Sequence, residues 1–260
     1  CTFIYLMLYD SENKIYRFIS YFCLAVAAAI KIYPAIFGIF SVKKRKLDRE
    51  VSFLVVLGLV MFLGPFAFLG GVEGFKGFVF GLSGTTGTYS EEGFGYDFGI
   101  YNLCRLLSSL FNGHQTEVAY IELIVVTILI GVIGFICAKE YWEQLCICSL
   151  LIVFIPKFSM QYTLCFLLIP LIYMFKSPAK KIHGLYLAFF IMIFFPWIYV
   201  GVDKVNYMLG FEFSHLFSVG HIFMYIGLLG MFLTITLEGG LAKIKLLRNR
   251  KNKKVGTSKG

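Results

Sequence analysis

Residues 25–46 read AVAAAIKIYPAIFGIFSVKKRK, an apolar run that contains one lysine and ends in a basic turn. Lys31 lies within the run, and Pro34 follows three residues later. A lysine at membrane depth costs roughly 2.5 kcal/mol or more, so it usually faces a protein interior or a watery cavity. Because proline removes a backbone donor, we expect a bend in the helix beside Lys31. The stretch predicts a polar pocket that opens into a membrane bundle.

The composition of the whole chain indicates the same environment. Of its 260 residues, 58% are hydrophobic and 15% are charged, and the mean hydropathy is +0.79, whereas soluble domains carry about 25% charged residues. Several apolar runs approach or exceed the roughly 18 residues that a spanning helix needs. We predict an all-α, polytopic membrane helix bundle of about seven spans, with a partial span at 1–9. The spans are expected near 18–40, 51–70, 117–138, 144–156, 159–175, 184–201 and 217–237.

The basic residues lie mostly between the expected spans. The loops 41–50, 139–143 and 176–183, together with the tail 241–260, hold 17 of the 24 lysines and arginines. Cytoplasmic loops of membrane proteins carry such an excess. We therefore expect a multi-pass protein of the cell membrane with a bundle over 1–240 and a basic cytoplasmic tail. The tail is expected to be attracted to anionic lipid headgroups, and a nucleic-acid partner is not expected despite the net charge of +9.

The longest segment outside the expected spans is 71–116, which is rich in glycine and aromatic residues. Such a composition suits an extracytoplasmic loop at the membrane surface, because aromatic rings favour the headgroup level. Within it, Leu103, Leu106, Leu107 and Leu110 follow a helical stripe. The stripe predicts an amphipathic helix over 101–111 that lies in the interface, with an ordinary membrane-anchoring helix as the alternative.

Signatures of soluble enzymes are missing from the sequence. It contains no Gly-rich phosphate loop followed by Lys-Ser/Thr, no H-E-x-x-H and no G-x-S-x-G. The seven cysteines lie nearly all in apolar runs, which is typical of core residues. His215 and His221 lack a third ligand nearby in sequence. We therefore predict neither a metal site nor a cofactor.

Three segments together resemble glycosyltransferase family 87. AAAIKIYPAIFGIF followed by KKRK resembles the family's alanine-rich helix, Lys-x-Tyr-Pro signature and basic turn. Residues 156–170 are similar to its Pro-x-Ser…Tyr stretch and the apolar helix that ends in proline. Asn102 stands where the family often shows Asn-Gln-Ser, although Leu103 and Cys104 depart from that pattern. These are polyprenol-phosphate-mannose-dependent, alpha-mannosyltransferase-like membrane proteins of the GT-C superfamily.

The resemblance implies a reaction and a fold. The chain would form the C-terminal part of a GT-C bundle and transfer a hexose, with mannose as first candidate, from a polyprenyl-phosphate donor to an extracytoplasmic glycan or glycolipid acceptor. The family's base is a carboxylate in the first outer loop, which is expected upstream of Cys1, so the catalytic residue stays unassigned and the sequence is expected to be a C-terminal fragment. The alternatives are a non-enzymatic lipid-linked-glycan transporter or flippase, a glycan polymerase, and a structural subunit.

Two cations are candidates for binding the donor phosphate. Lys31 is the first, because an ammonium gains far more from a phosphate at low dielectric than in water. Its alternative is to snorkel or to pair with an acid such as Glu122. Arg105 opens the interfacial helix and suits bidentate phosphate binding, with contact to lipid headgroups as its alternative.

Four further residues are candidates for the substrate pocket. Tyr33 would hydrogen-bond the same ligand as Lys31, and Tyr162 would reach a cavity between the short helices, with packing as the alternative for both. His114 is a candidate with a polar rim as its alternative, and Asn102 follows from the resemblance alone.

Overall fold

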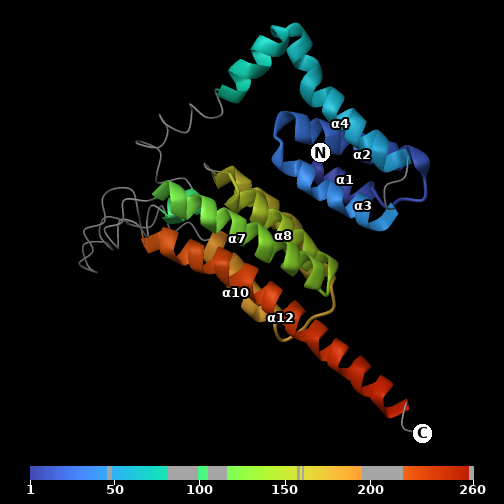
Figure 1. Ribbon diagram of the computed structural model, residues 1–260, viewed down its shortest axis with the longest axis vertical. Coiled ribbons are helices and arrows are strands. Elements are labelled where there is room, and N and C mark those ends of the chain that lie inside the picture. The colour runs from blue at the N-terminus through green and yellow to red at the C-terminus, as the bar shows by residue number, and fades with distance from the viewer. Residues whose placement is uncertain are drawn as a thin grey trace. The chain divides into compact units, whose positions relative to one another are not determined.

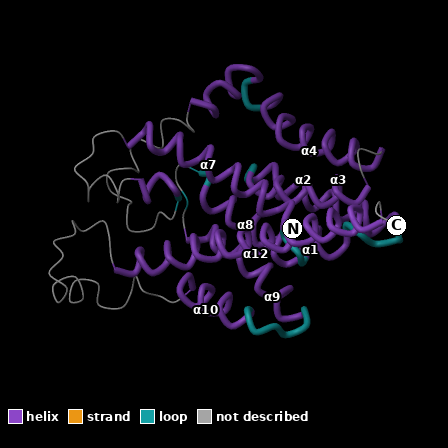
Figure 2. Tube along the Cα trace, turned by 60° about the horizontal axis from the view of Figure 1, so that its bottom comes forward, coloured by secondary structure: helices purple, strands orange, loops and turns teal. Residues whose placement is uncertain are grey.

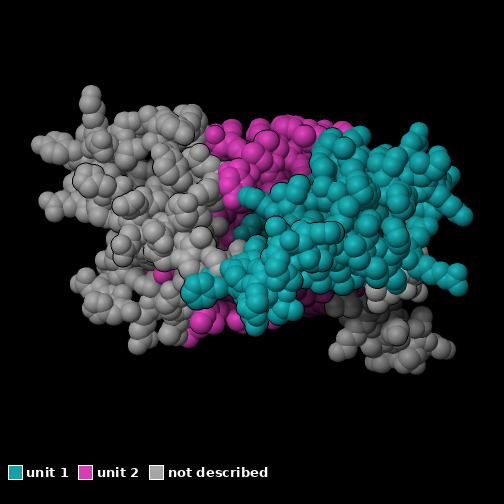
Figure 3. All heavy atoms as spheres, turned by 90° about the horizontal axis from the view of Figure 1, so that it is seen from above, with its two compact units in different colours: residues 1–89 teal, residues 90–260 magenta. Residues whose placement is uncertain are grey.

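The computed structural model is helical throughout the elements that it describes (Figure 1, Figure 2). This confirms the all-α prediction. The chain forms two compact units, Cys1–Tyr89 and Ser90–Gly260 (Figure 3). The residues that the structure describes are 1–45, 49–80, 99–104, 116–156, 159, 161–194 and 219–257.

The first unit is built around two long helices that run side by side in the same direction. Phe18, near the start of one, stacks on Phe53, near the start of the other, with ring centroids 5.6 Å apart. Asn13 caps the first of them, because its Oδ1 accepts a hydrogen bond from the Ile15 amide at 2.9 Å. The elements of this unit are α1 (Thr2–Leu8), α2 (Lys14–Ile30), the 3₁₀ helix η1 (Tyr33–Gly38), α3 (Ile39–Arg45), α4 (Arg49–Phe68) and a helix over 71–80.

The predicted span 18–40 is not a single helix. α2 stops at Ile30, and Lys31 adopts an extended backbone with φ −146° and ψ 127°. Its amide still donates to the Ala27 carbonyl at 3.0 Å, and η1 then begins with a proline in its first turn. Pro34 suits this position, because amides in the first turn of a helix have no partner within the helix and a proline there costs no hydrogen bond. The apolar run predicted that Lys31 lies in the middle of a helix. Lys31 instead lies at the end of α2.

A second departure follows α4. Gly70 and Gly71 have φ of 92° and 58°, a left-handed conformation that glycine adopts without steric cost. They reverse the chain so that 71–80 returns along α4, where the ring of Phe66 meets that of Phe75 edge to face at 5.3 Å. The first ten residues of the predicted loop 71–116 are therefore helical.

The second unit surrounds one short helix, α8, in which every residue from Trp142 to Phe154 is buried. A helix that is apolar on all sides, as this one nearly is, belongs in an interior. The other elements of this unit are a helical turn within 99–104, α7 (Thr116–Cys137), the 3₁₀ helix η3 (Gln161–Leu167), α9 (Leu168–Lys176), α10 (His183–Phe194) and α12 (Val219–Thr257).

Glycines allow α12 to approach its neighbours closely. A Cβ added at Gly230 would lie 2.6 Å from the ring of Phe189 on α10, and one added at Gly239 would lie 2.4 Å from the Cys137 carbonyl oxygen at the end of α7. Small residues at helix interfaces are the usual means of close packing in membrane proteins. The close packing of α12 against α10 and α7 therefore depends on the absence of side chains at Gly230 and Gly239.

The predicted number of spans is too high for the described residues. Three helices are long and apolar enough to cross a membrane, namely Arg49–Phe68, Ala119–Cys137 and Ile222–Leu246. α8, with 14 residues, is about 21 Å long, whereas the hydrocarbon core is about 30 Å thick. The segments Tyr162–Lys176 and His183–Phe194 are likewise apolar but short.

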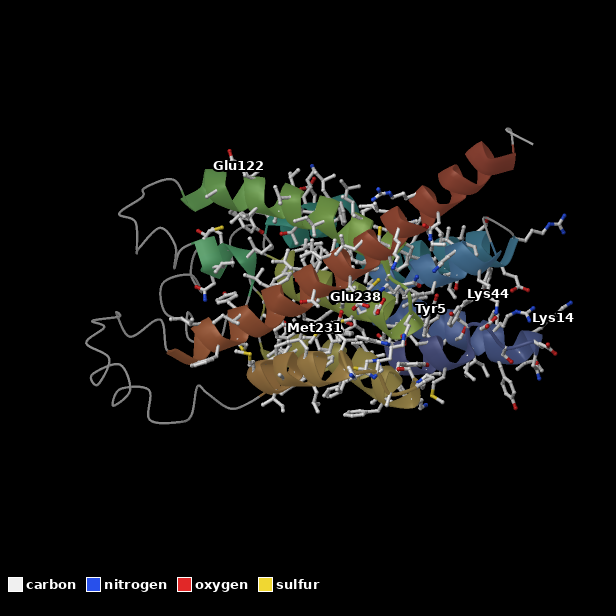
Figure 4. All side chains as sticks on the ribbon, turned by 90° about the horizontal axis from the view of Figure 1, so that it is seen from below. Tyr5, Lys14, Lys44, Glu122, Met231 and Glu238 are labelled. Atoms are coloured by element: carbon white, nitrogen blue, oxygen red, sulfur yellow. The ribbon has the colours of Figure 1, made fainter. Side chains whose placement is uncertain are left out.

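Ion pairs join the helices at one end of the second unit. Lys139, after α7, pairs with Glu238 of α12 (Figure 4), and Lys180, before α10, pairs with Glu140. Glu140 also accepts a hydrogen bond from the Trp142 indole at 2.8 Å. These pairs connect the turn between α7 and α8 to the middle of α12 and to the loop before α10.

Candidate functional site

α1 holds the backbone that follows the break between α2 and η1. The buried Tyr5 hydroxyl donates to the Phe37 carbonyl at 3.1 Å and shares a hydrogen bond with Ser41 at 2.7 Å (Figure 4). Lys31 and Tyr33 are half-buried at this break. The structure thus brings together two of the predicted site residues on a short, braced piece of backbone.

An apolar groove adjoins the break. Its volume is about 450 Å³, and Ile32, the residue between Lys31 and Tyr33, forms part of its wall. Because no side chain along the groove is charged, it suits an alkyl or isoprenoid chain rather than a sugar. The lining residues are Leu24, Ala25, Ala28, Ile32, Ala35, Gly38, Ile39, Val42, Val51, Leu54, Val55, Gly58, Leu59 and Phe62.

A partly buried ion pair joins the starts of α2 and α4 and was missed by the sequence analysis. Arg17 donates to both carboxylate oxygens of Glu50, at 2.9 and 2.8 Å. Its remaining Nη1 donates to the Ser11 and Glu12 carbonyls at 2.9 and 2.8 Å. All these partners are within the protein, so the pair serves to hold the two groove-forming helices together. The signal was an arginine one turn into an apolar helix.

Asn102 lies in the second unit and is fully buried. Just before it in the chain, Tyr101 meets the ring of Tyr120 edge to face at 5.1 Å, and the Gly99 carbonyl accepts a hydrogen bond from the Tyr225 hydroxyl at 3.1 Å. Asn102 is thus enclosed where 99–104 meets the starts of α7 and α12. Nearby, burial raises the pKa of the Cys104 thiol to about 11, which keeps it protonated and unreactive at neutral pH.

The remaining candidates are not brought to this place. The Tyr162 side chain is 48% exposed at the start of η3, whereas we expected it in a cavity between short helices. Glu122, named above as an alternative partner of Lys31, is exposed on α7 and points away from the bundle (Figure 4). Arg105 and His114 lie outside the described residues.

The candidates therefore separate by unit. Lys31 and Tyr33 lie at the break of the first unit, on either side of the groove residue Ile32, while Asn102 and Tyr162 belong to different parts of the second. Only the first pair combines a half-buried cation, a hydroxyl and an adjoining apolar groove. This arrangement can bind an anion attached to a long hydrocarbon chain.

Comparison with known proteins identifies the family. No curated protein and no solved structure matches the chain. The model of glycosyltransferase family 87 matches residues 3–156, which is more than half of the 260 residues and includes the break, the groove, α7 and α8. The chain thus belongs to glycosyltransferase family 87, and its apolar helices and this family make it a membrane glycosyltransferase.

Proposed function

We propose that this chain transfers a hexose, with mannose as first candidate, from a polyprenyl-phosphate carrier to an extracytoplasmic glycan or glycolipid, in the manner of GT-C enzymes. The observation that supports the proposal most is the groove beside Lys31, within the region that the family model matches. An apolar groove with a half-buried lysine next to one of its lining residues fits the two ends of a lipid phosphate.

Each part of the carrier has a counterpart in the first unit. The groove would receive the isoprenoid chain, since burying apolar surface contributes about 25 cal/mol per Å². The Lys31 ammonium would neutralise the phosphate, and the Tyr33 hydroxyl would donate a hydrogen bond to it. Because the phosphate is the leaving group when the sugar departs, a cation beside it also stabilises the charge that develops in the transition state. The base that deprotonates the acceptor is not assigned to any described residue.

Replacing Lys31 with alanine is expected to lower transfer by about tenfold, because a hydrogen bond to a charged group contributes at least about 1.5 kcal/mol. The measurement is transfer of labelled hexose from the polyprenyl-phosphate donor by the full-length protein in membrane vesicles. Lys31→Arg, which keeps the charge, should lose less than Lys31→Ala.

Lys14 provides a matched control for this substitution. It is an exposed lysine on the same helix (Figure 4), about 25 Å from Lys31 along the helix axis. Lys14→Ala should leave transfer within about twofold. Equal rates for Lys31→Ala and the unmodified protein would remove Lys31 from donor binding.

Filling the groove is expected to raise the KM for the donor by about tenfold or more without loss of folded protein. Gly58 lines the groove, and a Cβ added there would meet nothing within 4 Å. Gly58→Leu therefore places a side chain in open space while improving helix propensity. Gly64→Leu is the control, because Gly64 lies on the same helix, equally open and outside the groove lining. If both variants keep the unmodified KM, the isoprenoid chain binds elsewhere.

A further inference from the structure

The C-terminal helix continues well past the level where its neighbours end. The Lys243 ammonium donates to the Ile136 carbonyl at 3.3 Å, one residue before α7 ends at Cys137. Gly239 is the residue of α12 that lies against the end of α7, because a Cβ added there would be 2.4 Å from the Cys137 carbonyl oxygen. The Lys243 side chain therefore reaches back toward that level from four residues farther along α12. α12 remains helical to Thr257, so about 27 Å of helix extends beyond Gly239.

This extension carries one sign of charge only. After Glu238 the sequence has no acidic residue. The eight cations that follow are Lys243, Lys245, Arg248, Arg250, Lys251, Lys253, Lys254 and Lys259.

A helix of this composition repels itself. Like charges three or four residues apart are neighbours on a helix surface and each pair costs about 0.2–0.5 kcal/mol. A free helix of this length is also marginal in water. Anions bound beside the helix relieve this repulsion. The like-charged pairs are 245/248, 248/251, 250/253, 250/254 and 251/254.

We propose that the extension of α12 beyond Lys243, the α12 extension, binds the anionic headgroups of the leaflet from which it emerges, chiefly through Lys245 and Arg248. The candidate span in α12 ends at Leu246, and along a straight helix these two cations lie within about 3 Å of that residue, whereas Lys253 and Lys254 lie about 11 and 12 Å beyond it. The Debye length at physiological salt is about 8 Å, so the nearer pair interacts with the surface and the farther pair is screened. This binding is independent of the sugar and of the donor site.

Hydrogen exchange of the backbone amides of 247–257 tests the proposal on the full-length protein in nanodiscs. In phosphatidylcholine alone these amides should exchange rapidly, and phosphatidylglycerol should protect them. Lys245→Gln/Arg248→Gln should weaken that protection about twentyfold, close to fivefold for each cation near the surface. Lys253→Gln/Lys254→Gln should weaken it by less than about threefold. Glutamine keeps the helix propensity of lysine and arginine, so both variants remain comparable in fold.

Three results would overturn the proposal. The first is equal exchange in the two kinds of nanodisc. The second is a loss in the distal variant as large as in the proximal one. The third is protection that appears only when an RNA oligonucleotide or an acidic peptide is added, which would identify a soluble partner instead of the lipid surface.

Discussion

Replacing Glu50 with alanine is expected to lower the free energy of unfolding of the first unit by about 3 kcal/mol. The substitution leaves the Arg17 guanidinium, whose side chain is only 8% exposed, without its bidentate partner. Breaking a buried pair typically costs 3–5 kcal/mol, and we expect the lower end because the Glu50 side chain is 35% exposed. Since the pair joins α2 to α4, the loss should also loosen the groove.

The measurement is unfolding of the protein in mixed micelles on titration with a denaturing detergent. Glu73→Ala is the control, because Glu73 and Lys76 form an exposed pair in the same unit, with side chains 79% and 65% exposed. It should change stability by less than about 0.5 kcal/mol. The double variant Arg17→Met/Glu50→Leu should recover much of the loss, because apolar residues can replace a buried pair. A loss from Glu50→Ala no larger than that from Glu73→Ala would show that the ion pair is not structural.

The second large effect is expected at Gly239. Its added Cβ would lie 2.4 Å from the Cys137 carbonyl oxygen and 2.7 Å from the carbonyl carbon. Backbone atoms cannot turn aside as a flexible side chain can, so α12 would have to move away from α7. We expect Gly239→Ala to destabilise the second unit by about 2–3 kcal/mol, toward the upper end of the range for overpacking.

Gly240, the next residue, is the control for the Gly239 substitution. A Cβ at Gly240 would meet nothing within 4 Å, and alanine is better than glycine in a helix by about 0.5–1 kcal/mol. Gly240→Ala should therefore stabilise the protein slightly in the same detergent titration. Similar midpoints for Gly239→Ala and Gly240→Ala would mean that the close approach of α12 to α7 does not exist in solution.

Apolar length predicted part of the fold. The spans expected near 51–70, 117–138 and 217–237 correspond to Arg49–Phe68, Thr116–Cys137 and the apolar part of α12. The all-α class followed from the same runs. Hydropathy reports how much apolar sequence is available but not where the backbone leaves the helix. Hydropathy therefore predicts one span over 18–40, whereas the backbone becomes extended at Lys31.

Local sequence likewise predicted only part of the candidate site. Local sequence identified Lys31 and Tyr33, because a cation and a proline within an apolar run are visible without any tertiary information. The groove and the Arg17–Glu50 pair depend on α2 lying beside α4, a contact between segments 33 residues apart. The 48% exposure of Tyr162 depends on how η3 follows the short helix α8, which no pattern of residues in that segment specifies.

The most direct test of the donor site is photo-cross-linking of the full-length protein with a polyprenyl phosphate that carries a diazirine near the start of its isoprenoid chain. The predicted result is labelling of peptides that contain 24–32 and 51–62, abolished by excess unlabelled carrier and reduced in Gly58→Leu but not in Gly64→Leu. Labelling that spares both peptides while unlabelled carrier still competes would place the carrier outside this groove and contradict the account.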